Sequence, residues 1–91
     1  MKDLVVEKRL NQIKNWQNER IVKYFLLTDN HNRYKIMISE QTNNGNTELE
    51  INKLFNDKQV ALDLIEFLYE NSVSLEQSNE IVEDLLRKRG G

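Results

Sequence analysis

The fold is decided by residues 55–70, FNDKQVALDLIEFLYE, where the spacing of the apolar residues changes from strand-like to helical. Asn56 is a favourable N-cap residue, and Gln59 follows it at the interval of a capping box. Asn71 tolerates the left-handed conformation that often ends a helix. These signals predict a helix over residues 57–70 that ends near Asn71.

The apolar residues of this helix occupy a wide face. At about 100° per residue they cover an arc of about 220°, which leaves only the acidic residues and their neighbours for water. So broad an arc must be covered on two sides, by a sheet and by a second helix. We therefore expect Leu64, Phe67 and Leu68 to be deeply buried in a central helix, with the second helix outside it.

A second helix is predicted shortly after the first. Ser74 and Gln77 stand at the capping-box interval, and the apolar periodicity then continues to about Lys88. The apolar arc of this helix is narrower, about 140°. Residues 57–89 are thus predicted to form a helical hairpin with a short link.

The residues before Asn56 have the alternation and the short apolar runs of β-strands. Asn44-Gly45 is typical of a tight hairpin turn, because both residues tolerate a positive φ, and we expect Gly45 to have one. Ile13 and Trp16 are also spaced for a helix with Leu10, so an N-terminal helix remains an alternative to the first strand. Four strands are predicted, at residues 4–10, 20–28, 33–40 and 47–55.

Together these elements predict an α+β fold: a four-stranded antiparallel β-meander followed by a two-helix hairpin packed on one face. A chain of 91 residues is expected to form one domain, residues 1–91, with the sheet in residues 1–56. The sequence has no cysteine, so no disulfide or thiolate site is possible. Its apolar runs are too short for an export signal or a membrane span, and a cytoplasmic location is expected.

Four stretches of the C-terminal half form a recognisable pattern: Phe55–Val60, Leu64-Ile65, the turn Asn71–Leu75, and Ile81–Leu86 with its Glu-Asp pair. With these stretches the chain resembles a family of short proteins of unknown function from low-GC Gram-positive bacteria. The resemblance implies strands followed by two helices, and it brings no functional residue with it.

Catalytic chemistry has little support in the sequence. His31 is the single histidine and lies in a polar turn, Asp29–Asn32, with no nucleophile predicted beside it. Gly45, Gly90 and Gly91 are the only glycines, so no phosphate loop is present, and no calcium loop occurs. We expect a protein that is not an enzyme and that needs no cofactor and no metal.

The charge distribution is the most informative surface property. Residues 1–56 carry nine basic and seven acidic residues, whereas residues 57–86 carry eight acidic residues and one basic residue, Lys58. A solvated face is the simplest explanation, and a docking surface for a basic patch of another protein is the functional one. The predicted partner-binding residues are Asp63, Glu66, Glu70, Glu76, Glu80, Glu83 and Asp84.

Nucleic-acid binding is not expected. A DNA-reading second helix would present basic and amide side chains, and this one presents carboxylates. The predicted sheet does carry basic residues beside Tyr24 and Tyr34, but we expect both tyrosines to support the core or the sheet surface and not to stack on bases. The basic residues concerned are Arg20, Lys23, Arg33 and Lys35.

Two functions follow as hypotheses. The first is a protein-binding regulator or inhibitor that docks through the acidic helical face, such as a phage- or mobile-element-encoded antagonist of a nucleic-acid-handling bacterial complex. The second is a structural or assembly protein that acts as a homodimer, joined through sheet edges or an apolar patch.

Overall fold

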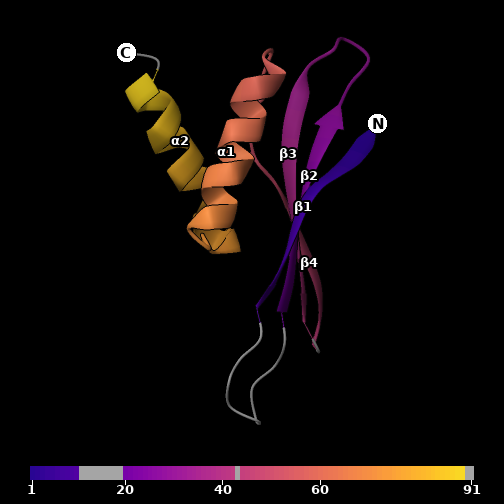
Figure 1. The fold of residues 1–91 in the computed structure, drawn as a ribbon. Helices are drawn as coiled ribbons and strands as arrows, with labels where there is room; N and C mark the ends of the chain where they lie inside the picture. The colour runs from indigo at the N-terminus through magenta and orange to yellow at the C-terminus, as the bar shows by residue number, and fades with distance from the viewer. Residues whose placement is uncertain (11–19, 43, 90–91) are drawn as a thin grey trace.

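The computed structural model describes residues 1–10, 20–42 and 44–89, and it confirms the predicted α+β layout. One antiparallel sheet in the order β1-β2-β3-β4 carries two helices on one of its faces (Figure 1). The strands are β1 (Lys2–Leu10), β2 (Arg20–Thr28), β3 (Tyr34–Thr42) and β4 (Gly45–Glu50). They are followed by α1 (Lys58–Glu70), the short 3-10 helix η1 (Leu75–Gln77) and α2 (Ser78–Arg89).

The strand predictions agree best in the middle of the sheet. β2 has the predicted bounds, and β1 excludes the alternative helix for residues 2–10. Ile13 and Trp16 lie outside the described residues. The hairpin between β3 and β4 is tighter than predicted, because Thr42 pairs directly with Gly45, whose φ of 140° confirms the expected positive value.

The fourth strand ends earlier than predicted, at Glu50. Ile51 and Phe55 are nevertheless both buried, and the Ile51 N–H still donates to the Ile36 carbonyl of β3 at 2.9 Å. The Asn52 N–H donates instead to Asn79 Oδ1 of α2 at 2.9 Å, and Phe55 returns to β3 in an isolated bridge with Tyr34. The last part of the predicted strand is therefore interrupted by a detour toward α2.

The N-cap of the first helix is one residue later than predicted. Asp57, and not Asn56, is the N-cap residue, and its carboxylate accepts the Gln59 N–H at 2.9 Å. Ser74 likewise begins only the 3-10 helix η1. The second α-helix begins at Ser78, whose buried hydroxyl donates to the Ser74 carbonyl at 2.9 Å.

The link between the helices has the bonding of a Schellman motif. Val73 N–H donates to the Leu68 carbonyl at 3.2 Å, and Ser72 N–H donates to the Tyr69 carbonyl at 3.3 Å. The left-handed residue is Ser72, with φ 49°, so the prediction that Asn71 would take this conformation is wrong. Glycine usually occupies this position because a Cβ disfavours it.

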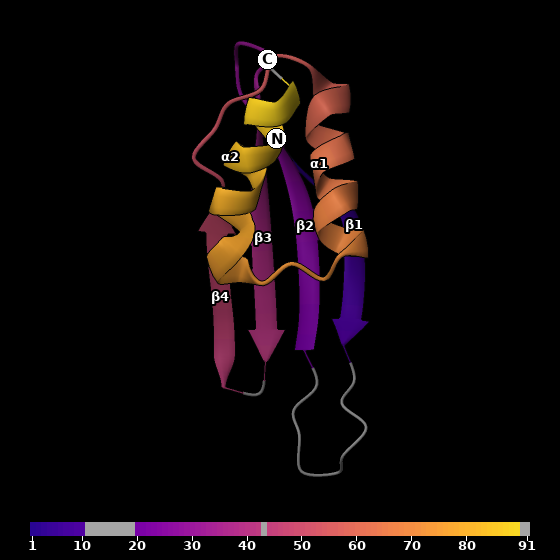
Figure 2. The same ribbon diagram turned by 90° about the vertical axis from the view of Figure 1, so that its left-hand side faces the viewer.

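The core lies between the helices and one face of the sheet. β2 and β3 contribute alternate residues, and α1 contributes four residues including Leu64 and Leu68, as predicted. Figure 2 shows α2 beside α1 over the same face, and its Val82 is completely buried. The second helix is therefore part of the core layer and not the outer element that we predicted. The core cluster comprises Val22, Tyr24, Leu26, Ile36, Ile38, Ile51, Phe55, Ala61, Leu64, Ile65, Leu68 and Val82.

Candidate interaction surfaces

The seven predicted partner-binding residues lie on the helical layer but do not share one side of it, because Glu66 lines a groove with Val5 and Val6 of β1. Six are exposed and Asp63 is half-buried, and the Asp63 carboxylate accepts the Gln59 side-chain amide at 2.9 Å. Asp84 Oδ1 lies 3.8 Å from Arg87 Nη1, which partly offsets its charge. We call this set the acidic layer: Asp63, Glu66 and Glu70 on α1, Glu76 on η1, and Glu80, Glu83 and Asp84 on α2.

Phe67 lies at the margin of the acidic layer, and the prediction that it belongs to the core is wrong. We expected it to be deeply buried, yet 38% of it is exposed. At about 100° per residue, Phe67 stands about 110° from the centre of the buried arc of α1. Tyr69 and Leu62 lie on the opposite flank, toward β1, so Phe67 is on the flank toward α2. The seam between the helices leaves its ring partly in water.

The second surface is the face of the sheet opposite the helices, which no described residue covers (Figure 1). The register places Leu4 opposite Phe25, and Phe25 opposite Met37, so three apolar side chains cross three strands in one row. Leu4 is 52% exposed, Phe25 is half-buried, and Met37 is screened by its neighbours. Ile21 and Leu27 extend this row along β2. We call this surface the open face.

Charges of opposite sign lie at the two ends of the apolar row. On the β1–β2 side, Lys2 Nζ lies 4.5 Å from the centre of the Phe25 ring, and Lys23 pairs with Glu7 across the strands. On the β4 side, Glu48 and Glu50 are exposed. The open face is therefore basic toward β1 and β2 and acidic along β4, apart from Glu7 and Lys35, and the Lys35 ammonium lies 3.3 Å from Glu50 Oε1.

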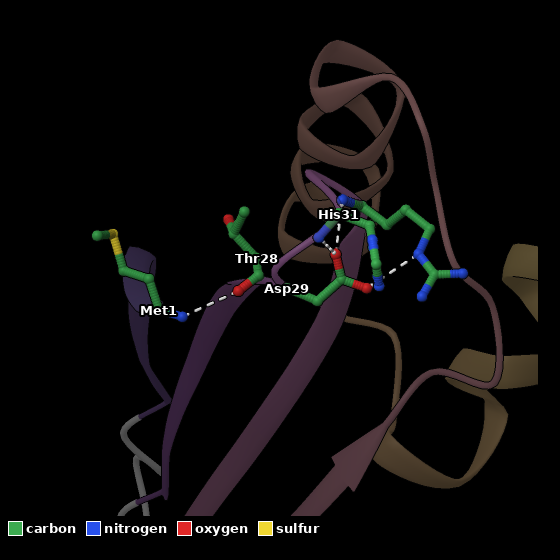
Figure 3. Close-up of polar contacts among 5 residues, drawn as sticks. Met1, Thr28, Asp29 and His31 are labelled. Carbon is green, nitrogen blue, oxygen red and sulfur yellow. Dashed lines mark hydrogen bonds and ion pairs between the residues drawn. The ribbon is translucent and has the colours of Figure 1, made fainter.

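His31 lies in a turn whose backbone is held by the Asp29 carboxylate. Figure 3 shows the Asp29 carboxylate turned toward the backbone of His31. Asp29 Oδ1 accepts the backbone N–H groups of His31 and Arg33 at 2.8 and 2.9 Å. The Arg33 backbone N–H is the main cause that lowers the pKa of the Asp29 carboxyl, and the His31 N–H adds to it. In the same view, the Met1 ammonium donates to the Thr28 carbonyl at 2.9 Å.

The two tyrosines weighed for stacking on bases lie on the covered side of the sheet. Tyr24 is 2% exposed, and burial raises the pKa of its phenol, with a smaller contribution from the Glu40 carboxylate. Tyr34 is half-buried and packs against the core. This confirms that both support the core. Phe25 is the one aromatic residue on the open face among the described residues.

Two structural features bear on other classes of function. Among residues 1–10, 20–42 and 44–89, no group of three or more His, Asp or Glu side chains could hold a metal ion. No helix in the described part of the chain is long and apolar enough to cross a membrane.

Comparison with known proteins places the chain in a family. Residues 1–88 match the model of a family of unknown function (DUF6514). The match covers the strands as well as the helices, and so extends beyond the C-terminal half in which a resemblance was found. No curated protein and no solved structure matches the chain.

Proposed function

Because the chain belongs to the DUF6514 family, whose function is unknown, we propose a role from its surfaces: it is a non-enzymatic assembly protein that pairs with a second copy through the open face. The apolar row Leu4–Phe25–Met37 supports this most directly. An antiparallel sheet with helices on one face usually exposes polar residues on the other. Contiguous apolar side chains there are typical of an interface.

The apolar row of the open face suits a second copy as the occupant. A two-fold axis parallel to the strands would place β4 of one protomer over β1 of its partner, and β2 over β3. Phe25 would then lie opposite the partner's Met37, whereas Glu48 would lie at the level of the partner's Glu7, so the pairing depends on the apolar row and not on charge. Such an interface is self-complementary in its apolar centre, as two-fold symmetry requires.

Sedimentation of single-residue variants tests this pairing. Phe25→Glu should weaken the dimer at least about thirtyfold, because it buries a carboxylate at the centre of the interface. The monomer should stay folded, since Phe25 lies outside the core cluster. Phe67→Glu is the matched control, because it makes the same change on the helical layer, and its dimer should persist. A wild-type chain that sediments as a monomer at all concentrations would contradict the proposal.

The acidic layer supports a second candidate function, docking to a basic patch of another protein. The exposed Phe67 favours it, because aromatic side chains within a charged rim are frequent anchors of interfaces. If the chain comes from a low-GC bacterium or its phage, the target would be a nucleic-acid-handling complex with a basic surface. Association would be fast and would weaken with added salt.

A charge-reversed variant tests the acidic layer. Glu76, Glu80 and Glu83 are the positions to change to Lys, because Asp84 already pairs with Arg87. The variant should remain as stable as the wild type or gain slightly, since Glu76 and Glu80 repel each other at four-residue spacing. In a pull-down from host extract at low salt, the variant should not retain the proteins that bind to the wild type. A Glu48→Lys, Glu50→Lys variant is the control. Retention equal to wild type would mean that the acidic layer is only a solvated surface.

A further inference from the structure

A small polar cavity lies on the covered side of the sheet, where β1, β2 and β3 meet the link between the helices. Its volume is about 50 Å³, several times the space of about 10–15 Å³ that one water molecule requires. The cavity has apolar walls from Val22 and Ile38. Its polar lining includes Lys8, Arg20, Glu40, Ser72 and Ser74.

Lys8 is held in place on one side of the cavity. Its ammonium donates to the Tyr69 carbonyl at 2.8 Å and to Ser72 Oγ at 2.7 Å. Tyr69 is in the last turn of α1 and Ser72 follows its end, where the negative end of the helix dipole favours a cation. Ser72 has a φ of 49°, a value at which glycine is the usual residue. The serine at this position supplies the hydroxyl that accepts a hydrogen bond from the Lys8 ammonium.

Arg20 has an unused donor at the same cavity. Its Nη1 lies 3.4 Å from Glu40 Oε2, but its Nε is buried and has no hydrogen-bond partner among the described residues. Buried donors without an acceptor are rare in folded proteins. The Nε–H and Nη2–H groups form a planar fork that matches the two oxygens of a carboxylate or phosphate. The side chain as a whole is 42% exposed although its Nε is not, so an anion in the cavity would engage both donors of the fork once the guanidinium turns toward it.

The charge balance of the lining also favours an anion. Lys8 and Arg20 contribute two positive charges, and Glu40 contributes one negative charge that is already engaged with Arg20. An added cation would meet two fixed cations, whereas an anion would meet one excess positive charge and at least one unused donor. Water could fill the space, but it would leave this excess charge in place.

We propose that this cavity is a binding site for a small oxyanion, with Arg20 as its bidentate donor and Lys8 as its second cation. The volume suits a single carboxylate or phosphate group and not a larger ligand. The group could be free in solution or could belong to a side chain or terminus of another protein. The site is independent of the open face, because Arg20 and Lys8 line the covered side of the sheet.

Nuclear magnetic resonance of the full chain tests the site, with sodium acetate and inorganic phosphate as probes at constant ionic strength. The Nε–H resonance of Arg20 should shift and saturate with one or both probes. Arg20→Gln should abolish saturable binding, and Lys8→Gln should weaken it about tenfold. Arg87→Gln is the matched control, because Arg87 is exposed on α2 and does not line the cavity, and its affinity should equal that of the wild type.

The possible outcomes distinguish a carboxylate ligand from a phosphate ligand, and both of these from a site that binds neither. Saturation by acetate alone indicates a carboxylate ligand, and saturation by phosphate alone indicates a phosphate-bearing one. If Arg20→Gln does not fold, Arg20→Lys keeps the charge without the fork and should still lose most of the affinity. Shifts that never saturate, or equal affinity in wild type and Arg20→Lys, would overturn the site. Neither result depends on whether the chain forms a dimer.

Discussion

The two faces of the sheet are made by the same strands but differ in what completes them. On the covered face, Tyr24, Leu26, Ile36 and Ile38 are at most 2% exposed because α1 and α2 lie over them. On the open face, the same strands carry an apolar row that only neighbouring side chains screen. Alternation in a strand therefore determines which residues share a face, whereas burial depends on what packs against that face.

The largest expected effect is on the covered face. Leu64→Ala should lower the free energy of unfolding by about 2–5 kcal/mol, because Leu64 is 2% exposed and its removal leaves a cavity between helix and sheet. Phe67→Ala is the comparison within the same helix and should cost much less, since Phe67 is already 38% exposed. Urea unfolding measures both. Similar losses of stability for the two variants would mean that Phe67 is buried as deeply as Leu64.

Met37→Ala measures the open face. Met37 is only 6% exposed, but the space left by its side chain opens to solvent and not into a closed core, so we expect a loss of about 1–2 kcal/mol. The loss should grow with protein concentration if the open face forms a dimer, because each folded partner then stabilises the other. Urea unfolding at low and high protein concentration gives the comparison. A loss independent of concentration would favour a monomer.

The covered face was largely predicted from the sequence, whereas the open face was missed. The break in periodicity near Asn56 placed the helices, and the composition of residues 20–28 gave β2 its bounds. In the same strand Ile21, Phe25 and Leu27 are also apolar, which is typical of a strand covered on both faces. That signal was available in the sequence, and it would have pointed to an interface on the sheet.

Other features depend on tertiary contacts that no local pattern encodes. Phe67 lies at the edge of a broad apolar arc, and its exposure is set by where α2 lies beside α1. Ser72 takes a left-handed conformation without being Gly or Asn, and its hydroxyl meets Lys8 from 64 residues away. The oxyanion cavity therefore requires the register of β1 and the path of the interhelical link, neither of which the sequence specifies by itself.

Gly45 lies in the hairpin between β3 and β4, next to the acidic edge of the open face. Its φ of 140° disfavours any side chain, although no atom lies within 4 Å of an added Cβ. Gly45→Ala should therefore cost about 1 kcal/mol through backbone strain alone. Thr47→Ala, at an exposed position of β4, is the control. The residue next to Gly45, Asn46, is less suitable as a control because its Oδ1 accepts a hydrogen bond from Ser39 Oγ at 2.9 Å. Equal melting temperatures for the two variants would indicate a loose turn.

The smallest expected effect is a pH dependence that belongs to the covered face. Burial raises the pKa of the Tyr24 phenol above its ordinary value of 10.0, so the folded state holds the proton more tightly than the unfolded chain does. The resulting stabilisation is fully present below pH 10.0 and is lost as the pH rises through the folded-state pKa. Tyr24→Phe should remove this part of the alkaline decline. The loss of unfolding free energy caused by Tyr24→Phe at neutral pH should be modest, because the hydrogen bond from the phenol to the Leu68 carbonyl is long, at 3.5 Å.

Urea unfolding between neutral pH and pH 11 compares Tyr24→Phe with the wild type. The difference in unfolding free energy between the two proteins should be constant up to about pH 10 and should narrow above it. A difference that stays constant up to pH 11 would mean that the covered face does not isolate the Tyr24 phenol from water in the way that its exposure of 2% indicates.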